Sequence, residues 1–354
     1  MSAPHPFTAV ETRLLSPPAD GVMVTHVVPR SAFADAGVRA GDVVVAVGDS
    51  AAPDRPTFLR AFQPRNDGPP SVRLRILTVD GATRTLDTPL PLGGVSVCGV
   101  RAGVAAWEVL DDPPDAPDLS VFEQDGALWL RNSLGTARAG YEILVWRRAG
   151  DLLDLDVHFA LGGDDGHGGA WRYVTRSRST HRLERGLPVV RSAFWEMDVL
   201  RGDVAQEGGT WRGVRGRPDG TTEPVERPAT GPMTTAYTST LLPLTMPLRT
   251  GARLTVVSAN DGVPLPACRV RFVCTGRGTV RVDGADVDAW CIVQRHYGLD
   301  SYGGDERFHV TDDRRLVRVD WGPNYADCWG ELVPPGDVLD GAPPGVQLPP
   351  DLGS

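Results

Sequence analysis

Alternation of apolar and polar residues is the feature that most constrains the fold of this chain. From Leu153 to Phe159 every second residue is apolar, and the residues between them are Asp154, Asp156 and His158. This period of two is typical of a β-strand with one buried face. Similar runs recur along the second part of the chain, at Glu142–Trp146, Trp171–Arg178, Ala193–Val199, Leu254–Ser258, Arg269–Thr275, Val287–Tyr297, Arg307–Val310 and Leu316–Trp321. Turn residues separate the runs, so the sequence predicts a large antiparallel sheet that curls or stacks to bury its apolar face.

Length and hydropathy indicate a globular chain with two or three compact units. The chain has 354 residues, which is longer than one typical domain. Of these residues 41% are hydrophobic, which is enough to form buried cores. No stretch approaches the length of an apolar membrane span. The first residues, MSAPHPFTAV, lack the basic and apolar regions of a signal peptide. We therefore expect a cytoplasmic location for the chain as written, or an envelope location if it is trimmed from a longer precursor.

Charge and residue usage exclude several functional classes. The net charge is −9, with acidic and basic residues interspersed, so nucleic acid is not an expected partner. All 36 basic residues are arginine, which excludes a Schiff-base lysine and a P-loop lysine. The sequence has no metal-ligand spacing and no nucleotide loop, so we expect no metal and no cofactor. An odd number of cysteines without a CxxC pair predicts reduced thiols; they are Cys98, Cys268, Cys274, Cys291 and Cys328.

A compact motif near the N-terminus resembles a known peptide-binding domain. Residues Gly21 to Val47 read GVMVTHVVPRSAFADAGVRAGDVVVAV, with an alternating strand, a short Ala-rich helical turn and a Gly-Asp turn before a run of valines. This order of parts resembles a bacterial PDZ domain, and the resemblance covers residues 6–92. It implies a PDZ-like α+β domain that accepts an extended peptide or protein partner by strand addition.

The resemblance also implies where a peptide would lie. The groove would run between the strand Val10–Arg13 and a short helix at 56–62, with Ala9 standing where the family usually has glycine. Phe58 and Phe62 share one helix face and are either core residues or pocket lining. The predicted peptide-binding residues are Phe7, Thr8, Ala9, Val10, Thr12, Phe58 and Phe62.

The rest of the chain divides into three predicted regions. Residues 93–119 are rich in proline and acidic residues and read as a linker, 120–333 as an antiparallel β half-barrel of one or two subdomains, and 334–354 as a disordered or surface tail. Within 235–333 a second resemblance rests on segments such as Leu241–Leu248, Val280–Gly284 and Leu316–Trp321. They look like a bacterial family of unassigned function with an incomplete, lipoprotein-carrier-like β-barrel. The expected fold is therefore mainly β, with the PDZ-like domain followed by a large antiparallel sheet curled into a half-barrel or sandwich.

Aromatic residues in this second part suggest a pocket. Eight of the nine tryptophans lie from Trp129 onward, and large flat side chains give contact area at a small entropic cost. A curled sheet could hold a hydrophobic small molecule among them, or the same side chains could simply fill its interior. The predicted apolar-ligand residues are Trp290, Tyr297, Phe308, Trp321 and Trp329.

Histidines and aspartates on neighbouring predicted strands form a candidate acid–base set. Asp288, His296, His309 and Asp320 would carry catalysis if they faced one cavity, because histidine transfers protons near neutral pH. Residues of these types also occur on the wet face of any antiparallel sheet.

Three functions are compatible with these observations. The first is a non-catalytic binding protein with a peptide groove and an aromatic-lined half-barrel for an apolar ligand or protein partner. The second is a small-molecule enzyme of the cyclase, isomerase or hydrolase type with a His/Asp site inside the β domain. The third is an assembly component whose edge strand pairs with another copy.

Overall fold

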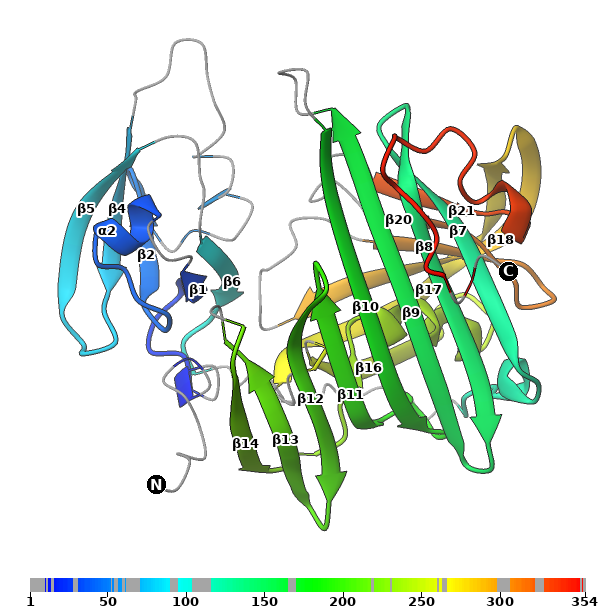
Figure 1. The fold of residues 1–354 in the computed structure, drawn as a ribbon, viewed down its shortest axis with the longest axis horizontal. Coiled ribbons are helices and arrows are strands. Elements are labelled where there is room, and N and C mark those ends of the chain that lie inside the picture. Colours follow the sequence, from blue (N-terminus) through cyan, green and yellow to red (C-terminus); the bar gives the residue numbers. More distant parts are fainter. Residues whose placement is uncertain are drawn as a thin grey trace.

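The computed structural model describes residues 10, 12–13, 16–27, 31–51, 53, 57–58, 61, 71–89, 95–103, 116–164, 170–217, 220–229, 231–259, 261–262, 266–297, 306–321, 328–350 and 352. For residues 26, 89, 96, 164, 170, 266–269 and 296–297 it describes the backbone alone. Two sheets make up the described fold, and Figure 1 shows the smaller blue and cyan sheet beside the larger sheet, which runs from green to orange. None of the described helices is long and apolar enough to cross a membrane.

The smaller sheet has the order β5-β4-β2-β1-β6, with β3 paired to β2. Alternate residues of its central strands, among them Val22 and Val44, pack on Phe33 and Phe58 to form one core. Ser31 caps the short helix by accepting a hydrogen bond from the backbone N–H of Ala34 at 3.2 Å. The elements are β1 Gly21–Val27, α2 Ala32–Asp35, β2 Val43–Val47, β3 Ser50–Ala51, β4 Ser71–Leu77, β5 Thr83–Pro89 and β6 Val95–Val100.

Two features of this unit differ from the expectation. Val10, Thr12 and Arg13 are helical rather than extended. The Arg13 guanidinium donates hydrogen bonds to the backbone oxygens of Gly41, Thr78 and Val79 at 2.8–3.0 Å, which ties this helical segment to the sheet. In addition, β6 lies within the expected linker and pairs antiparallel with β1. The structure thus shows a six-stranded sheet here, and membership of the PDZ family stays a prediction.

The larger sheet has fifteen strands in the order β14-β13-β12-β11-β10-β9-β8-β7-β21-β20-β19-β18-β17-β16-β15. Every neighbouring pair is antiparallel except β15 and β16. The first eight strands are β7 Gly126–Leu134, β8 Ala137–Ala149, β9 Leu152–Asp164, β10 Ala170–Arg182, β11 Val189–Glu196, β12 Val199–Glu207, β13 Thr210–Gly216 and β14 Thr222–Pro228. The others are β15 Thr234–Thr235, β16 Arg253–Ala259, β17 Pro266–Val282, β18 Ala285–Tyr297, β19 Glu306–Val310, β20 Leu316–Asp320 and β21 Cys328–Leu332.

This sheet curls until one edge lies on its own inner face. A twisted sheet of more than about ten strands rarely stays open and flat. The backbone N–H of Val189 donates to the Met233 oxygen at 2.7 Å, and a Cβ at Gly202 would lie 2.0 Å from the Gly262 oxygen. The residues that follow β14 and β16 therefore press against β11 and β12. Among the described strands the sheet does not close into a barrel, because β14 and β15 remain its two ends.

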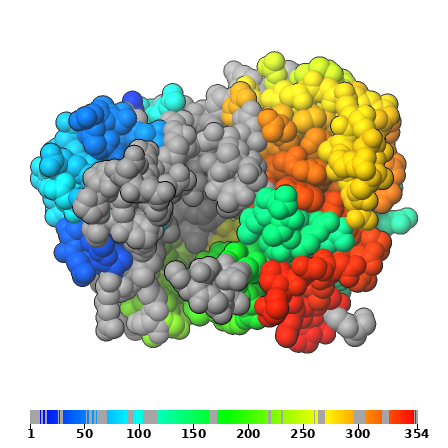
Figure 2. Space-filling view, turned by 90° about the horizontal axis from the view of Figure 1, so that it is seen from above, coloured from blue at the N-terminus to red at the C-terminus, as the bar shows by residue number. Residues whose placement is uncertain are grey.

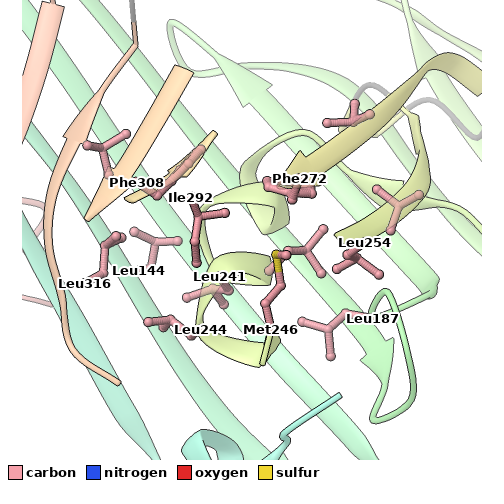
Figure 3. Close-up of a cluster of buried hydrophobic side chains, with 14 of the residues drawn as sticks. Leu144, Leu187, Leu241, Leu244, Met246, Leu254, Phe272, Ile292, Phe308 and Leu316 are labelled. Carbon is pink, nitrogen blue, oxygen red and sulfur yellow. The ribbon is translucent and has the colours of Figure 1, made fainter. Parts of the chain in front are cut away.

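The interior of the curl is filled by the chain itself. Short 3-10 helices η2 (Tyr237–Thr240) and η3 (Leu242–Thr245) connect β15 to β16. Leu241, Leu242 and Leu244 are at most 1% exposed, and burying each contributes roughly 2 kcal/mol. Figure 3 shows this segment between side chains of both walls, such as Leu144 of β8 and Ile292 of β18. This half of the curl is an ordinary packed core, as in other protein interiors.

The end of the chain lies against the outer face of β7 to β10. Val338 and Val346 are 1% and 7% exposed and pack with Ile143, and the Tyr141 hydroxyl donates to the Gln347 oxygen at 2.9 Å. Figure 2 shows the red C-terminal residues beside the blue-green residues of β7 and β8. Two further 3-10 helices among the described residues are η1 Ser120–Phe122 and η5 Pro335–Asp337. Residues 334–350, expected to be disordered or at the surface, thus form an outer layer.

Candidate functional site

A row of aromatic rings lines the inner face of β9, β10 and β11 at one end of the curl. Ring centroids are 6.4 Å apart for Phe159 and Tyr173, 6.3 Å for Phe159 and Tyr237, and 6.3 Å for Phe194 and Tyr237. These distances are within the range of favourable aromatic pairs. Tyr173 is 37% exposed and the other three are partly buried. These four residues, the aromatic row, lead from the surface into the sheet.

Tyr237 is the inner end of the aromatic row. Its hydroxyl shares a hydrogen bond with the Thr175 hydroxyl, and its backbone N–H donates to a carboxylate oxygen of Asp261 at 3.3 Å. Burial raises the pKa of Tyr237 well above its usual value, and the nearby Asp261 and Glu142 carboxyls raise it further. The phenol is therefore protonated and lies within electrostatic reach of two acids.

Glu142 lies on the apolar face of β8. Strand alternation puts it on the same side as Leu144 and Trp146, both of which belong to the main core. It is 2% exposed, and the Thr240 hydroxyl donates a long hydrogen bond of 3.4 Å to it. Burial raises the pKa of Glu142 to about 8, because desolvation disfavours the charged carboxylate.

Glu306 occupies the opposite wall of the curl, at the start of β19. It shares its face with Phe308 and is 6% exposed. Burial raises its pKa to about 8, and Glu142 contributes to the rise. Burial likewise raises the pKa of the Cys328 thiol to about 12, again with a contribution from Glu142. Glu142 therefore interacts electrostatically with groups on both walls.

Asp261 is a third buried acid in this region. It is 5% exposed and accepts a hydrogen bond from the Ser177 hydroxyl. Burial raises its pKa, although hydrogen bonds from Ser177 and the backbone of Tyr237 oppose the rise. We call Glu142, Asp261 and Glu306 the acid cluster.

Two amide side chains near the acid cluster have buried atoms without a hydrogen-bond partner. Asn132 and Gln294 are 0% and 3% exposed, yet both amide atoms of Asn132 and the Gln294 oxygen are unpartnered. Gln294 lies directly opposite Glu306 in the ladder between β18 and β19. Asn132 pairs with Gly140, which is two residues from Glu142 on β8. Alternation therefore puts the side chains of Asn132 and Glu142 on the same inner face. Buried polar atoms without partners are rare in folded proteins.

The acid cluster has no cationic partner among the described residues. No arginine or histidine there influences the pKa of Glu142, Asp261 or Glu306. Ionising a buried carboxyl without a partner costs several kcal/mol, so Glu142 and Glu306 are mostly neutral at pH 7. In the described part of the chain no group of three His, Cys, Asp or Glu residues could hold a metal ion. The site can instead donate and accept hydrogen bonds, or become charged when a cation arrives.

The five residues predicted to line an apolar pocket do not share one surface. Phe308 is 1% exposed and packs 6.1 Å from Phe272. Trp321 lies over Gly330, where a Cβ would be 2.8 Å from its ring, which places it beside Asn132. Trp290 is partly buried against the core and donates to Asp312 at 2.8 Å. Trp329 lies on the outer face, under the guanidinium of Arg318 at 4.3 Å. The side chain of Tyr297 lies outside the described residues.

The residues predicted to bind a peptide are only partly described. Phe58 is fully buried in the core of the small sheet, and Val10 packs against the main core. Thr12 is exposed on its helical turn. Phe7, Thr8, Ala9 and Phe62 lie outside the described residues, so the predicted groove stays a prediction.

The predicted catalytic residues do not converge where they are described. His309 and Asp320 meet at 3.3 Å on the outer face of β19 and β20, with Arg318 also bonded to Asp320. Asp288 accepts a hydrogen bond from Thr279 at 3.1 Å near the exposed tip of the β17–β18 hairpin. Because Asp288 alternates with Trp290 toward the inner face, it lies on the opposite side of the sheet from His309. The side chain of His296 is not among those described, and a catalytic role for the four stays a prediction.

A cavity of about 620 Å³ opens on the outer face of β8 to β12. Several charged groups at this cavity pair with one another: Asp156 binds Arg176 and Arg178 at 2.7 and 3.1 Å, and Arg191 lies 3.5 Å from Asp203. Burial raises the pKa of Asp156, but His158 and Arg176 together hold it below the usual value. Since these charges are satisfied, the cavity points to a ligand less strongly than the acid cluster does. It is lined by Val145, Arg147, Asp154, Leu155, Asp156, His158, Arg178, Ser179, Thr180, Arg191, Ala193, Trp195, Asp203 and Leu352.

Comparison with known proteins finds only distant similarity, and that similarity is to solved structures. No family model matches the sequence, and no curated protein matches it. Among solved structures, the fold is similar to a β-barrel-like protein of the domain of unknown function DUF1849 from Brucella abortus. The two share 13% identity over 59% of this chain and 96% of that chain, with a TM-score of 0.34. A likeness this weak carries no argument about function.

The acid cluster and the aromatic row were not predicted from the sequence, although a signal was present. Within Glu142–Trp146, a glutamate shares the alternation face of a leucine and a tryptophan. Glu306 and Gln294 occupy equivalent positions beside Phe308 and Ile292. A charged or amide residue on the apolar face of a strand predicts a buried polar group. This criterion identifies Glu142, Glu306 and Gln294 from the sequence.

Proposed function

We propose that this chain is a non-catalytic binding protein that holds a small amphiphilic ligand along the aromatic row. The apolar part of the ligand would lie on the rings of Tyr173, Phe159 and Tyr237, and its polar end would reach the acid cluster. The observation that carries the proposal is that this partly exposed row ends at Glu142, a buried carboxyl with no described ion-pair partner. Apolar walls with a few converging polar groups are typical of ligand sites.

The contrast between the two halves of the curl supports this proposal. In the half around η3 buried leucines pack together and the polar groups are paired. The Thr245 hydroxyl donates to the Leu242 oxygen at 2.8 Å, and Arg314 donates to the Leu244 and Met246 oxygens at 2.7 and 2.9 Å. The other half retains unpartnered amide atoms at Asn132 and Gln294. Each buried polar atom left without a partner destabilises the fold by about 1–3 kcal/mol, so we do not expect such atoms in an interior that has only a structural role. A ligand that hydrogen-bonds to these atoms would satisfy them.

Neighbouring residues on β11 offer a matched test. Phe194 belongs to the aromatic row on the inner face, whereas Trp195 lines the outer cavity. Titration of the full chain with the neutral fluorophore N-phenyl-1-naphthylamine should show saturable enhancement of fluorescence. We expect Phe194→Leu to weaken binding by about fivefold or more, since an aromatic contact contributes roughly 1 kcal/mol, and Trp195→Leu to leave it unchanged. The reverse pattern, or no saturable binding, would contradict the proposal.

A separate proposal concerns the N-terminal unit, which would hold an extended peptide of a partner protein. It is supported by the resemblance of Gly21–Val47 to the PDZ motif. Since β6 pairs with β1, an added strand would use an edge of the sheet at β5 or β6. Labelled peptide libraries with free and with amidated C-termini test this idea on the full chain. Absence of saturable binding to either library would refute it.

One observation favours an enzyme as the second candidate. A carboxyl with a pKa of about 8 beside the Tyr237 phenol has the properties of a general acid or base near neutral pH. Mass spectrometry of small molecules that copurify with the chain would identify a ligand, and incubation of that ligand with the chain decides between a binding protein and an enzyme. The molecule should stay chemically unchanged during incubation with the wild type if the chain only binds it. Turnover by the wild type that Glu142→Gln abolishes would establish an enzyme.

A further inference from the structure

We infer that the ligand of the acid cluster carries a primary ammonium group, so that the site selects amphiphilic amines over neutral or anionic molecules of equal length. This inference rests on the binding role proposed for the aromatic row. It specifies the chemistry at the buried end of that row.

The first support is the kind of polar atom gathered there. The carboxyl groups of Glu142, Asp261 and Glu306 are buried within the same end of the curl. Asp261 already accepts hydrogen bonds from Ser177, Thr235 and the backbone of Ala236 and Tyr237, so the acceptors offered to a ligand are Glu142 and Glu306. The unpartnered oxygen of Gln294 lies opposite Glu306. Asn132 adds a second unpartnered amide oxygen together with its unpartnered Nδ2, which would be left for an acceptor elsewhere on the ligand. Ionised carboxylates and amide oxygens are acceptors, whereas a primary ammonium offers three donors and no acceptor. The site and the group are complementary.

The second support is the charge of the surroundings. The titratable groups that face the cluster are Glu142 on β8, Glu306 on β19, Cys328 on β21, Tyr237 on η2, Asp261 after β16, Tyr173 on β10 and, farther along β10, His181. Burial raises the pKa of Tyr237 and Cys328, so both are neutral at pH 7. Burial lowers the pKa of His181 to about 4, and its ring nitrogens bond to Ser179, Thr238 and the Leu187 oxygen. None of these described groups supplies a positive charge.

The aromatic row favours the same ligand. A cation near the face of a tyrosine or phenylalanine ring is attracted by the ring quadrupole, and the attraction strengthens when water is excluded. Tyr237 combines such a ring with proximity to Glu142 and Asp261. An anionic head group would be repelled by the negative faces of the rings, and it could bond to Glu142 and Glu306 only while these acids stay protonated.

The protonation states make the inference testable without knowing the natural ligand. With a pKa of about 8, Glu142 and Glu306 carry protons at pH 7. A bound ammonium stabilises the ionised carboxylate and displaces a proton, while an alkylammonium keeps its own proton at this pH. Affinity for an amine should therefore increase with pH between 6 and 8, by up to about tenfold per pH unit for one released proton.

Isothermal titration of the full chain at pH 7 compares three probes of equal length: n-octylammonium chloride, 1-octanol and sodium octanoate. We expect n-octylammonium to bind about tenfold more tightly than 1-octanol, and octanoate more weakly than both. Comparing Tris with phosphate buffer, which differ in ionisation enthalpy, should show release of about one proton per bound n-octylammonium. 1-Octanol should release none.

Two variants assign the effect to the acid cluster. Glu142→Gln removes a titrating group at nearly constant shape, and should abolish both the preference for n-octylammonium and most of the proton release. Glu226→Gln is the matched control, because Glu226 is an exposed carboxyl on β14, three strands away from β11, and pairs with Arg212 at 3.0 Å. It should keep both properties.

The outcomes separate the inference from the function on which it rests. Equal affinity for n-octylammonium and 1-octanol, weakened in both cases by Phe194→Leu, would overturn the ammonium inference and leave the binding function standing. Failure of all three probes to bind would overturn both. Binding of n-octylammonium that Glu142→Gln leaves unchanged would overturn the inference alone, because the cation would then lie elsewhere.

Discussion

Replacing Glu142 with glutamine should stabilise the ligand-free protein at mildly alkaline pH. Burial raises the pKa of Glu142 and of Glu306 from 4.5 to about 8 in the folded state. In the unfolded chain both carboxyls ionise near their ordinary pKa, so between these values the folded state binds more protons. The stabilisation by these groups is therefore fully present below the unfolded pKa and is lost as pH rises toward and through 8.

The magnitude follows from linkage. One bound proton changes the free energy of unfolding by about 1.4 kcal/mol per pH unit. From pH 6.5 to pH 8, each carboxyl should therefore remove about 1.5 kcal/mol of stability, and the pair about 3 kcal/mol. This pH window excludes the titration of His181. Burial lowers the pKa of His181 to about 4, so this histidine changes the free energy of unfolding only below about pH 6.5. The window also avoids the Cys274 and Cys328 thiols, whose raised pKa values matter above pH 8.

Urea unfolding followed by tryptophan fluorescence at pH 6.5, 7, 7.5 and 8 measures this slope. Glu142→Gln should at least halve the loss, because it removes one titrating group and also the effect of Glu142 on the pKa of Glu306. Glu196→Gln should leave the wild-type slope unchanged, since its carboxyl is paired with Arg201 at the surface. A wild-type stability that is flat across the window, or a variant slope equal to that of the wild type, would refute the assignment of buried, neutral carboxyls.

Two further predictions concern the curl and its outer layer. Gly202→Ala would place a Cβ 2.0 Å from the Gly262 oxygen and should lower the free energy of unfolding by about 2 kcal/mol. Gly336→Ala is the control, because Gly336 has open space around it. Equal urea midpoints for the two variants would contradict the predicted contact. Val338→Asp buries a charge at a position that is 1% exposed and should cost about 3 kcal/mol, whereas a loss no larger than that of Asp340→Asn would show that the C-terminal layer is not packed as described.

Strand existence was predictable because it is a local property. Leu153–Phe159 lies within β9, and Asp283-Gly284 forms the turn between β17 and β18, as alternation and turn chemistry indicate. The coarse fold follows from these signals: mainly β, with a large antiparallel sheet that is curled and not closed.

Pairing between distant strands was not predictable, because it depends on contacts across the whole chain. β21 pairs with β7, almost two hundred residues earlier in the sequence, and this pairing decides which residues face inward. Trp329 alternates with the buried Cys328 and thus points outward, whereas the sequence predicts that it lines a pocket together with Trp321. The predicted pocket drew only on the last strands, whereas the aromatic row comes mainly from β9, β10 and β11. Its fourth ring, Tyr237, lies in a 3-10 helix that has no strand period to reveal it.

The central claim is that a ligand lies on the inner face of the curl, between the aromatic row and the acid cluster. The most direct test is photo-crosslinking of the full chain with an alkylamine that carries a diazirine at mid-chain, followed by peptide mapping with mass spectrometry. Labelling at Phe159, Tyr173 or Tyr237, competed by excess n-octylammonium, is the predicted result. Labelling confined to Arg178, Trp195 and their neighbours on the outer face would contradict the claim.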